Sequence, residues 1–222
     1  MSRTLALFTA AWASVLRAAR QGQRTDALNL LRKYLRLADL PVQQRARAEA
    51  LAGRLCLASG NYARARRHLR RAWMLSPSCG RWAYLLGRAW AEDPLGRTDR
   101  AVRWFHRAWR CQPSNPLYRA AWGEALVHAG KYRQGCRLLY QAARLAPAQT
   151  SVLRYVVHGL IGAGRPALAL RLLGPARFLW RTTTAQRRLQ DWIRQLRYEQ
   201  ACRRRPQSTA KPTWATLPLR AG

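Results

Sequence analysis

The chain has 222 residues, 49% of them hydrophobic, which is enough for one domain or one short repeat array with a packed core. Its 41 lysine and arginine residues against 9 acidic residues give a net charge of +32, and only three of the basic residues are lysines. Such a charge indicates polyanionic partners, namely nucleic acid, an acidic protein or a membrane surface. The five cysteines are dispersed without a C-x-x-C pair, which argues against a disulfide framework or a zinc site and predicts reduced thiols in a cytoplasmic protein.

Residues 1–21 allow two interpretations. Arg3 precedes about a dozen apolar residues, and Ala-Trp-Ala at 11–13 is similar to a cleavage site, as in a secretory signal peptide. Alternatively, residues 9–21 form the first helix of a repeated unit. We favour the helix, because Gly22 keeps the spacing of later turn glycines. A signal peptide would instead make the protein an exported, envelope-associated adaptor. Neither this run nor any later one is long enough for a transmembrane helix.

The clearest local pattern lies in residues 57–77. Gly60 and Asn61 interrupt an apolar helical pattern, as a helix C-terminal glycine followed by an N-capping side chain should. After them, three residues share one helix face at i, i+4 and i+7, namely Ala65, Leu69 and Ala72. Pro77 then ends the second helix. The predicted unit is therefore helix, tight turn, helix.

This pattern recurs at steps of 36, 34 and 34 residues. Counterparts of the three helix-face residues are Ala101, Phe105 and Ala108, then Gly135, Leu139 and Ala142, then Ala169, Leu173 and Ala176. A period of 34 with small residues at fixed helical spacing resembles the tetratricopeptide repeat, a helix–turn–helix unit that stacks into a solenoid. The resemblance covers residues 8–180 and implies an all-α, right-handed α-solenoid of about five repeats. Their expected bounds are 8–41, 46–77, 80–113, 116–147 and 150–180.

The segment after the repeats predicts one more helix, over residues 184–204. Its apolar residues fall at i, i+3, i+4 and i+7 and form one stripe, namely Leu189, Trp192, Ile193 and Leu196. Stacked repeats leave an apolar face uncovered at the end of the array, so we expect this helix to cap it. Residues 205–222 have no periodicity and are predicted to be a disordered basic tail.

The sequence gives little support for catalysis. None of the nine acidic residues is paired at a spacing that suggests acid–base chemistry, and no nucleophile, phosphate-loop or zinc-protease motif occurs. We therefore expect no enzyme activity, no catalytic residue, no cofactor and no metal site.

The resemblance implies a binding surface, because the first helices of tetratricopeptide repeats line a concave groove that holds peptides. The residues of this chain at groove positions are Trp12, Arg47, Arg54, Arg81, Tyr84, Arg88, Arg154 and His158. Arginines with aromatics suit an acidic peptide or protein, although solvated arginines without a ligand are the simpler alternative. The lysine and asparagine clamp of chaperone-binding members has no counterpart here, so that activity is not implied.

A second arginine row recurs once per repeat on the exposed side of the second helices, at Arg67, Arg103, Arg137 and Arg171. A charged row is usually a solvated face. Here the interleaving acidic residues are missing, which favours a polyanion surface. The main functional prediction is a non-enzymatic scaffold that binds an acidic partner in the groove. The alternative is a nucleic-acid or ribonucleoprotein binder that uses the arginine-rich surface.

Overall fold

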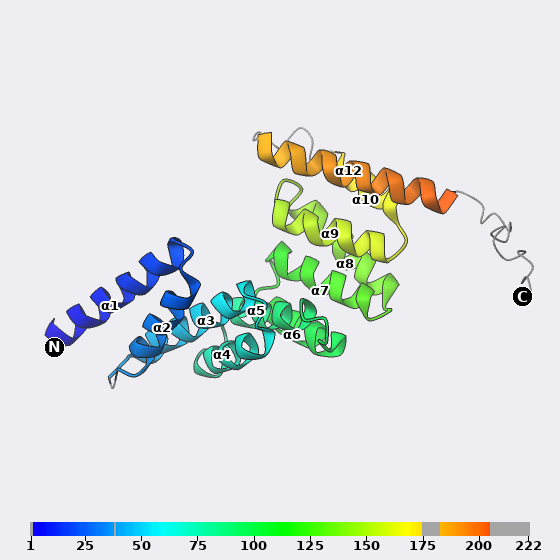
Figure 1. Cartoon of the computed structure of the whole chain (residues 1–222). Helices are drawn as coiled ribbons and strands as arrows, with labels where there is room; N and C mark the ends of the chain where they lie inside the picture. The colour runs from blue at the N-terminus through cyan, green and yellow to red at the C-terminus, as the bar shows by residue number, and fades with distance from the viewer. Residues whose placement is uncertain (1, 38, 175–182, 205–222) are drawn as a thin grey trace, which may run out of the picture.

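The computed structural model describes residues 2–37, 39–174 and 183–204, which form eleven α-helices and no strand (Figure 1). Ten of them pair as antiparallel hairpins in chain order. The first helices of the pairs are α1 (Ser2–Arg20), α3 (Val42–Ala58), α5 (Gly80–Ala91), α7 (Pro116–His128) and α9 (Thr150–Gly162). The second helices are α2 (Arg24–Leu35), α4 (Tyr62–Leu75), α6 (Thr98–Cys111), α8 (Tyr132–Leu145) and α10 (Pro166–Leu173). The last helix is α12 (Thr183–Arg204).

The turns inside the hairpins use the glycines that the sequence pattern predicts. Four of these turns place a glycine at a φ between 72° and 77°, namely at Gly22, Gly60, Gly130 and Gly164. This left-handed backbone conformation costs glycine nothing and ends the preceding helix. The turn between α5 and α6 is longer and works differently. Its Gly96 is required by close approach, because a Cβ there would lie 2.0 Å from the Trp90 carbonyl oxygen.

Small residues lie where helices cross closely. A Cβ on Gly53 of α3 would lie 2.5 Å from Leu69 Cγ of α4, and a Cβ on Gly87 of α5 would lie 2.6 Å from the Phe105 ring of α6. At both crossings the first helix therefore receives a large side chain of its second helix at a glycine. Ala72 on α4 is fully buried by the same packing. This repeated contact explains why the pattern recurs every 34 residues or so.

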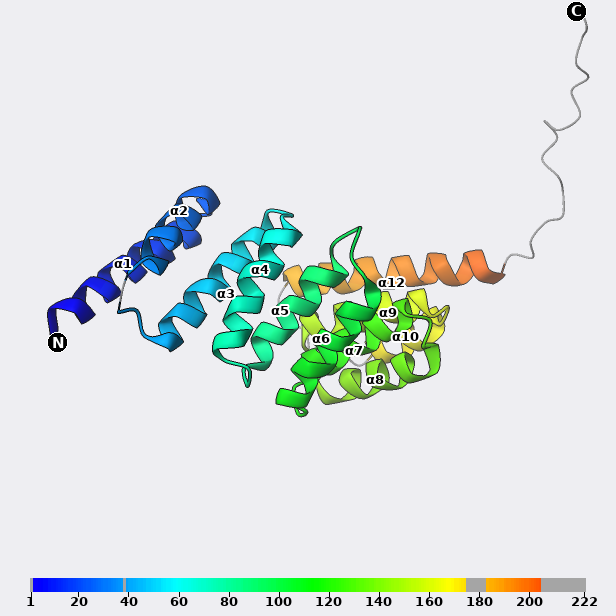
Figure 2. The same cartoon turned by 90° about the horizontal axis from the view of Figure 1, so that it is seen from below.

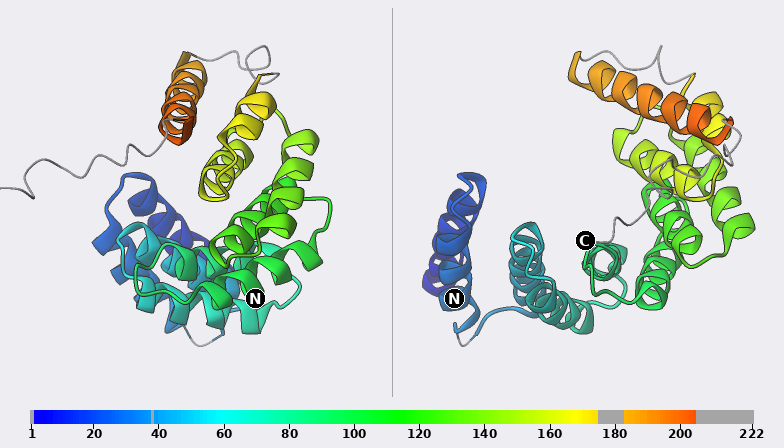
Figure 3. Two further views of the ribbon diagram at one scale, coloured as in Figure 1. Left: turned by 90° about the vertical axis from the view of Figure 1, so that its right-hand side faces the viewer. Right: turned by 45° about the vertical axis from the view of Figure 1, so that its right-hand side comes forward.

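Successive hairpins lie side by side and follow a curve from α1 and α2 to α12 (Figures 2 and 3). Helix α7 packs against α6, α8 and α9, so neighbouring hairpins share a continuous core. Tyr84 of α5 contacts Tyr155 of α9, although α7, the first helix of the hairpin between them, separates the two in the chain. Helices α5 and α9 therefore approach each other on the inner side of the curve. These features confirm the all-α solenoid.

Helix α12 packs against α9 and α10, at the end of the array (Figure 1). Its Leu196 is fully buried and joins the core that the last hairpins share, with Trp192 and Ile193 partly buried beside it. Helix α3 begins at Val42, four residues before the expected start of the second repeat, directly after Pro41. Residues 205–222, which we expect to form a tail, and residues 175–180 of the last repeat lie outside the described residues.

None of the helices in the part of the chain that the structure describes combines the length and the hydrophobicity needed to span a bilayer.

Candidate functional site

Three of the arginines predicted to line a groove, on α3 and α5, lie close to one another. Burial, together with the positive charges of Arg81 and Arg88 on α5, lowers the pKa of Arg54 on α3. The Arg88 guanidinium lies 2.6 Å from the Glu92 carboxylate one turn later in the same helix, so part of its charge is compensated. The other two have no carboxylate partner among the described residues. This cluster leaves a local excess of positive charge on two neighbouring first helices.

Tyr84, a predicted groove residue, is partly buried and lies near Arg88. Its ring stacks on Tyr118 of α7 with centroids 5.4 Å apart and lies 5.8 Å from the ring of Phe105. Its hydroxyl lies 2.8 Å from the hydroxyl of Tyr155 on α9. Tyr155 was not predicted from sequence, because its contact depends on the curvature of the whole array.

Arg154 and His158 lie on α9, one turn apart. The Arg154 guanidinium is 4.9 Å from the centroid of the Tyr155 ring, where a cation–π contact is favourable. Burial and the nearby Arg154 and His128 lower the pKa of His158. His158 therefore favours its neutral form and adds little to the charge of the concave side.

Glu124 of α7 is a second acidic residue near these basic side chains, besides Glu92. Burial raises its pKa to about 7 although the positive charge of Arg154 opposes the change. Glu92 adds to the increase by repulsion. At neutral pH the Glu124 carboxyl is therefore divided between its protonated and ionised forms, and it cancels only part of the arginine charge.

Trp12 and Arg47, the remaining predicted groove residues, line a separate small cavity of about 90 Å³ between α1, α2 and α3. The Trp12 ring packs on Tyr34 with centroids 5.4 Å apart, and the Tyr34 hydroxyl donates to Gln44 Oε1 at 2.8 Å. The predicted groove therefore divides into a cluster on α3, α5 and α9 and a separate site at the first hairpin.

The predicted row of arginines on the second helices lies at Arg67, Arg103, Arg137 and Arg171, all of them exposed. Arg103 forms an ion pair with Asp99 one turn earlier, so its charge is compensated. Arg137 and Arg171 make no ion pair with any described residue. The row is thus present, and its arginines differ in how far their charge is neutralised by a nearby carboxylate.

Tryptophans near this row pack against neighbouring helices and arginines. Trp73 of α4 meets Trp104 of α6 edge to face, and Trp109 of α6 stacks on Trp122 of α7 with centroids 5.0 Å apart. The Arg66 guanidinium lies 4.2 Å from the centre of the Trp90 ring. These rings are engaged in packing between repeats, which limits their use as stacking platforms for nucleic-acid bases.

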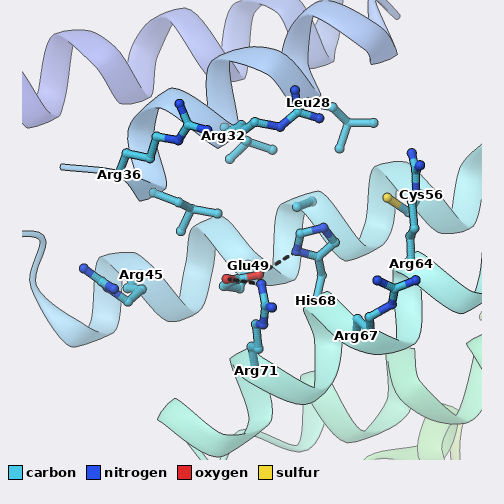
Figure 4. Close-up of a pocket in the computed structure, with 13 residues that line it drawn as sticks. Leu28, Arg32, Arg36, Arg45, Glu49, Cys56, Arg64, Arg67, His68 and Arg71 are labelled. Carbon is cyan, nitrogen blue, oxygen red and sulfur yellow. Dashed lines mark hydrogen bonds and ion pairs between the residues drawn. The ribbon is translucent and has the colours of Figure 1, made fainter.

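A pocket that sequence reasoning missed opens between α2, α3 and α4, with a volume of about 530 Å³ (Figure 4). Six arginines line it, namely Arg32, Arg36, Arg45, Arg64, Arg67 and Arg71. Glu49, the acidic residue of the pocket, is 7% exposed and accepts a hydrogen bond from His68 Nδ1 at 2.6 Å. The hint available from sequence is the spacing of the arginines on α2 and α4, which lie one helical turn apart.

Stacked helical hairpins with charged surfaces define a helical-repeat protein of the solenoid class. Within this class the match is specific, because residues 56–125 fit the family model described as Tetratricopeptide repeat. Residues 56–125 thus match the tetratricopeptide repeat family, and the hairpins before and after them continue the same fold. Comparison of the whole sequence with curated proteins finds no match.

Solved structures share this fold. MamA from Desulfovibrio magneticus RS-1, residues 41 to the end, superposes with a TM-score of 0.64 at 15% identity, covering 78% of this chain and 94% of that one. MamA MSR-1 gives a TM-score of 0.56 at 21% identity, covering 78% and 95%. YrrB, described as a TPR protein with an unusual peptide-binding site, gives 0.55 at 16% identity, covering 80% and 88%. At these identities the similarity is one of fold.

Proposed function

We propose that this protein is a non-enzymatic scaffold that binds an acidic segment of a partner protein on its concave side. The observation that carries the proposal is the arginine cluster of Arg54, Arg81 and Arg88, extended on α9 by Arg154. Burial lowers the pKa of Arg54, and the nearby positive charges of Arg81 and Arg88 lower it further. Arginines that repel one another in the free protein gain from a bound anion.

The chemistry of the cluster suits carboxylates. A guanidinium group presents parallel N–H donors that match the two oxygens of an Asp or Glu side chain. Tyr84, which is partly buried, adds apolar surface beside the charges, whereas Tyr118 and Tyr155 are buried. Glu124, with its pKa near 7, gives up its negative charge when a proton is available, so it does not exclude an acidic ligand.

The fold supports a protein partner more generally. Tetratricopeptide repeats act as protein-interaction scaffolds, and YrrB, which shares the fold, is described as having a peptide-binding site. We place the protein in the cytoplasm because its five cysteines are free thiols, two of them buried. The fold thus supports a protein partner, and the arginine cluster supports an acidic one.

The test is the binding of a fluorescent peptide of alternating Glu and Leu, followed by anisotropy at about 150 mM salt. Replacing Arg54, Arg81 and Arg154 by Gln should weaken binding by about tenfold or more, because each charge-assisted hydrogen bond contributes roughly 1.5–3 kcal/mol. The matched control replaces Arg133, Arg137 and Arg171, which are exposed and lie on α8 and α10. Equal weakening by both triple variants would show attraction by net charge instead of a site.

The second candidate is nucleic-acid binding by the second helices. The observation in its favour is that Arg67, Arg137 and Arg171 are exposed, one per hairpin, and make no ion pair with described residues. Spacing of one charge per repeat suits a ligand with regularly placed phosphates. We keep it second because the nearby tryptophans are used in packing.

A further inference from the structure

The arginine-lined pocket lies where the first two hairpins meet. Its lining comes from α2, α3 and α4, the second helix of one hairpin and both helices of the next. Leu28 of α2 packs against the core of the first hairpin and also against that of the second. The pocket therefore opens along the seam between two cores. It is separate from the concave cluster, and none of the predicted groove residues lines it.

Positive charge is concentrated around this cavity. Six of its thirteen lining residues are arginines, whereas lysine and arginine together make up 41 of the 222 residues of the chain. In Figure 4, Arg32 of α2 and Arg36, which directly follows α2, lie on one side, and Arg67 and Arg71 of α4 lie on the other. The pocket is thus richer in cations than the average of an already basic protein.

Most of these cations have no anionic partner among the described residues. The Arg71 guanidinium lies 3.7 Å from Glu49 Oε1, and Arg32 donates to the Asn29 side-chain oxygen at 3.5 Å. The other four arginines of the pocket form no ion pair within the described part of the chain. Charges that converge on a concave surface raise the local potential and attract anions.

Glu49 does not fill the role of a counter-ion for the whole pocket. It is almost fully buried, and one carboxylate oxygen accepts the His68 Nδ1 hydrogen bond while the other faces Arg71. Its negative charge therefore interacts with two side chains of α4, His68 and Arg71. We regard Glu49 as a positioning residue that holds His68 and Arg71 at the wall.

We propose that this pocket binds a compact ligand that carries two or more adjoining phosphate groups. Planar guanidinium forks match phosphate oxygens in pairs, and several forks suit several phosphates. A volume of about 530 Å³ falls in the range of small-molecule sites. The arginines surround one cavity, whereas a peptide strand would present its carboxylates along a line. Apolar side chains of Leu28, Leu31 and Leu35 also line the pocket.

The experiment is isothermal titration calorimetry of the full chain with sodium tripolyphosphate at about 150 mM salt. We expect one ligand per chain. Replacing Arg32, Arg64 and Arg67 by Gln should weaken binding by about tenfold or more. The matched control replaces Arg133, Arg165 and Arg197 by Gln, three exposed arginines outside the pocket and outside the row on the second helices. It removes the same charge elsewhere and should change affinity by less than about threefold. Several ligands per chain, or equal weakening by both variants, would overturn the proposal.

Two further measurements test whether binding depends on the guanidinium groups and whether the natural ligand is a nucleic-acid backbone. The charge-preserving variant with Lys at positions 32, 64 and 67 keeps the attraction and loses the forks, so it should bind several-fold more weakly; parent-like affinity would overturn a fork-built site. A single-stranded oligonucleotide that binds more tightly per phosphate, and loses the same factor in the Gln variant, would assign the pocket to a nucleic-acid backbone instead. This proposal is independent of the concave cluster. The variant in which Arg54, Arg81 and Arg154 are replaced by Gln should therefore bind tripolyphosphate like the parent.

Discussion

The hydroxyl groups of Tyr84 and Tyr155 lie 2.8 Å apart, joining α5 to α9 across 71 residues of sequence. Burial raises the pKa of both phenols, so both keep their protons and one donates to the other. The contact skips one first helix and ties the third hairpin to the fifth. It therefore fixes the curvature of the surface on which the arginine cluster lies.

Replacing either tyrosine by phenylalanine should destabilise the protein by about 1–2 kcal/mol, because the remaining buried hydroxyl loses its partner. The double variant Tyr84→Phe with Tyr155→Phe should cost less than the sum of the single changes, since no hydroxyl is then left unpaired. Urea denaturation measures all three. Additive costs would show that the two hydroxyls do not interact in solution.

Glu124 makes stability depend on pH. Its pKa is raised by burial from 4.5 to about 7 in the folded chain. The contribution of its protonated form is therefore complete below about pH 4.5 and is lost as the pH rises through about 7. Glu124→Gln should raise the stability by roughly 1–3 kcal/mol at about pH 8 and leave it unchanged near pH 4.5. Thermal melts at the two pH values give the comparison, and an equal gain at both would contradict the assigned cause.

Because α5 and α6 cross closely, we expect the stability of the fold to depend on the size of the side chains at the crossing. Ala108 is fully buried, so Ala108→Leu should force helices apart at a cost of about 1–3 kcal/mol. Arg137→Ala, on the exposed side of α8, should change stability by less than about 0.5 kcal/mol. Similar denaturation midpoints for the two variants would mean that the assignment of helix faces is mistaken.

Nucleic-acid binding by the second helices would show in its salt dependence. Arg103 is already paired with Asp99, so replacing Arg67, Arg103, Arg137 and Arg171 together by Gln should remove about three phosphate contacts. On single strands this flattens the slope of log affinity against log salt by about 2 units. Filter binding over a range of salt concentrations measures the slope. An unchanged slope would exclude this row as the phosphate contact.

Leu196 anchors α12 on the last hairpin. Because it is fully buried, Leu196→Ala should cost about 2–4 kcal/mol or release the helix from the array. Tyr198→Ala, two residues later on the same helix, provides the control because Tyr198 is 70% exposed. Limited proteolysis and thermal melts report on the two variants, and equal behaviour would show that α12 does not depend on this contact.

Features that depend on one hairpin could be predicted from the sequence, because their causes are local. The turn glycines and the small residues facing Leu69 and Phe105 follow from helix geometry and fixed spacing. The Tyr84–Tyr155 contact could not be predicted, since it depends on the summed rotation of three hairpins. The arginine pocket likewise depends on how far α2 stands from α4. The ion pair of Arg103 with Asp99 could have been predicted, because the two residues are spaced i, i+4 on one helix.

The position of α12 also limits how copies of the protein can join. Continuous stacking of one array on the next needs two free ends of opposite kind, and such head-to-tail contacts give open filaments. Helix α12 covers the face of the last hairpin with Leu196 in its core. A second copy that stacked head to tail on this face would first have to displace α12 and expose Leu196.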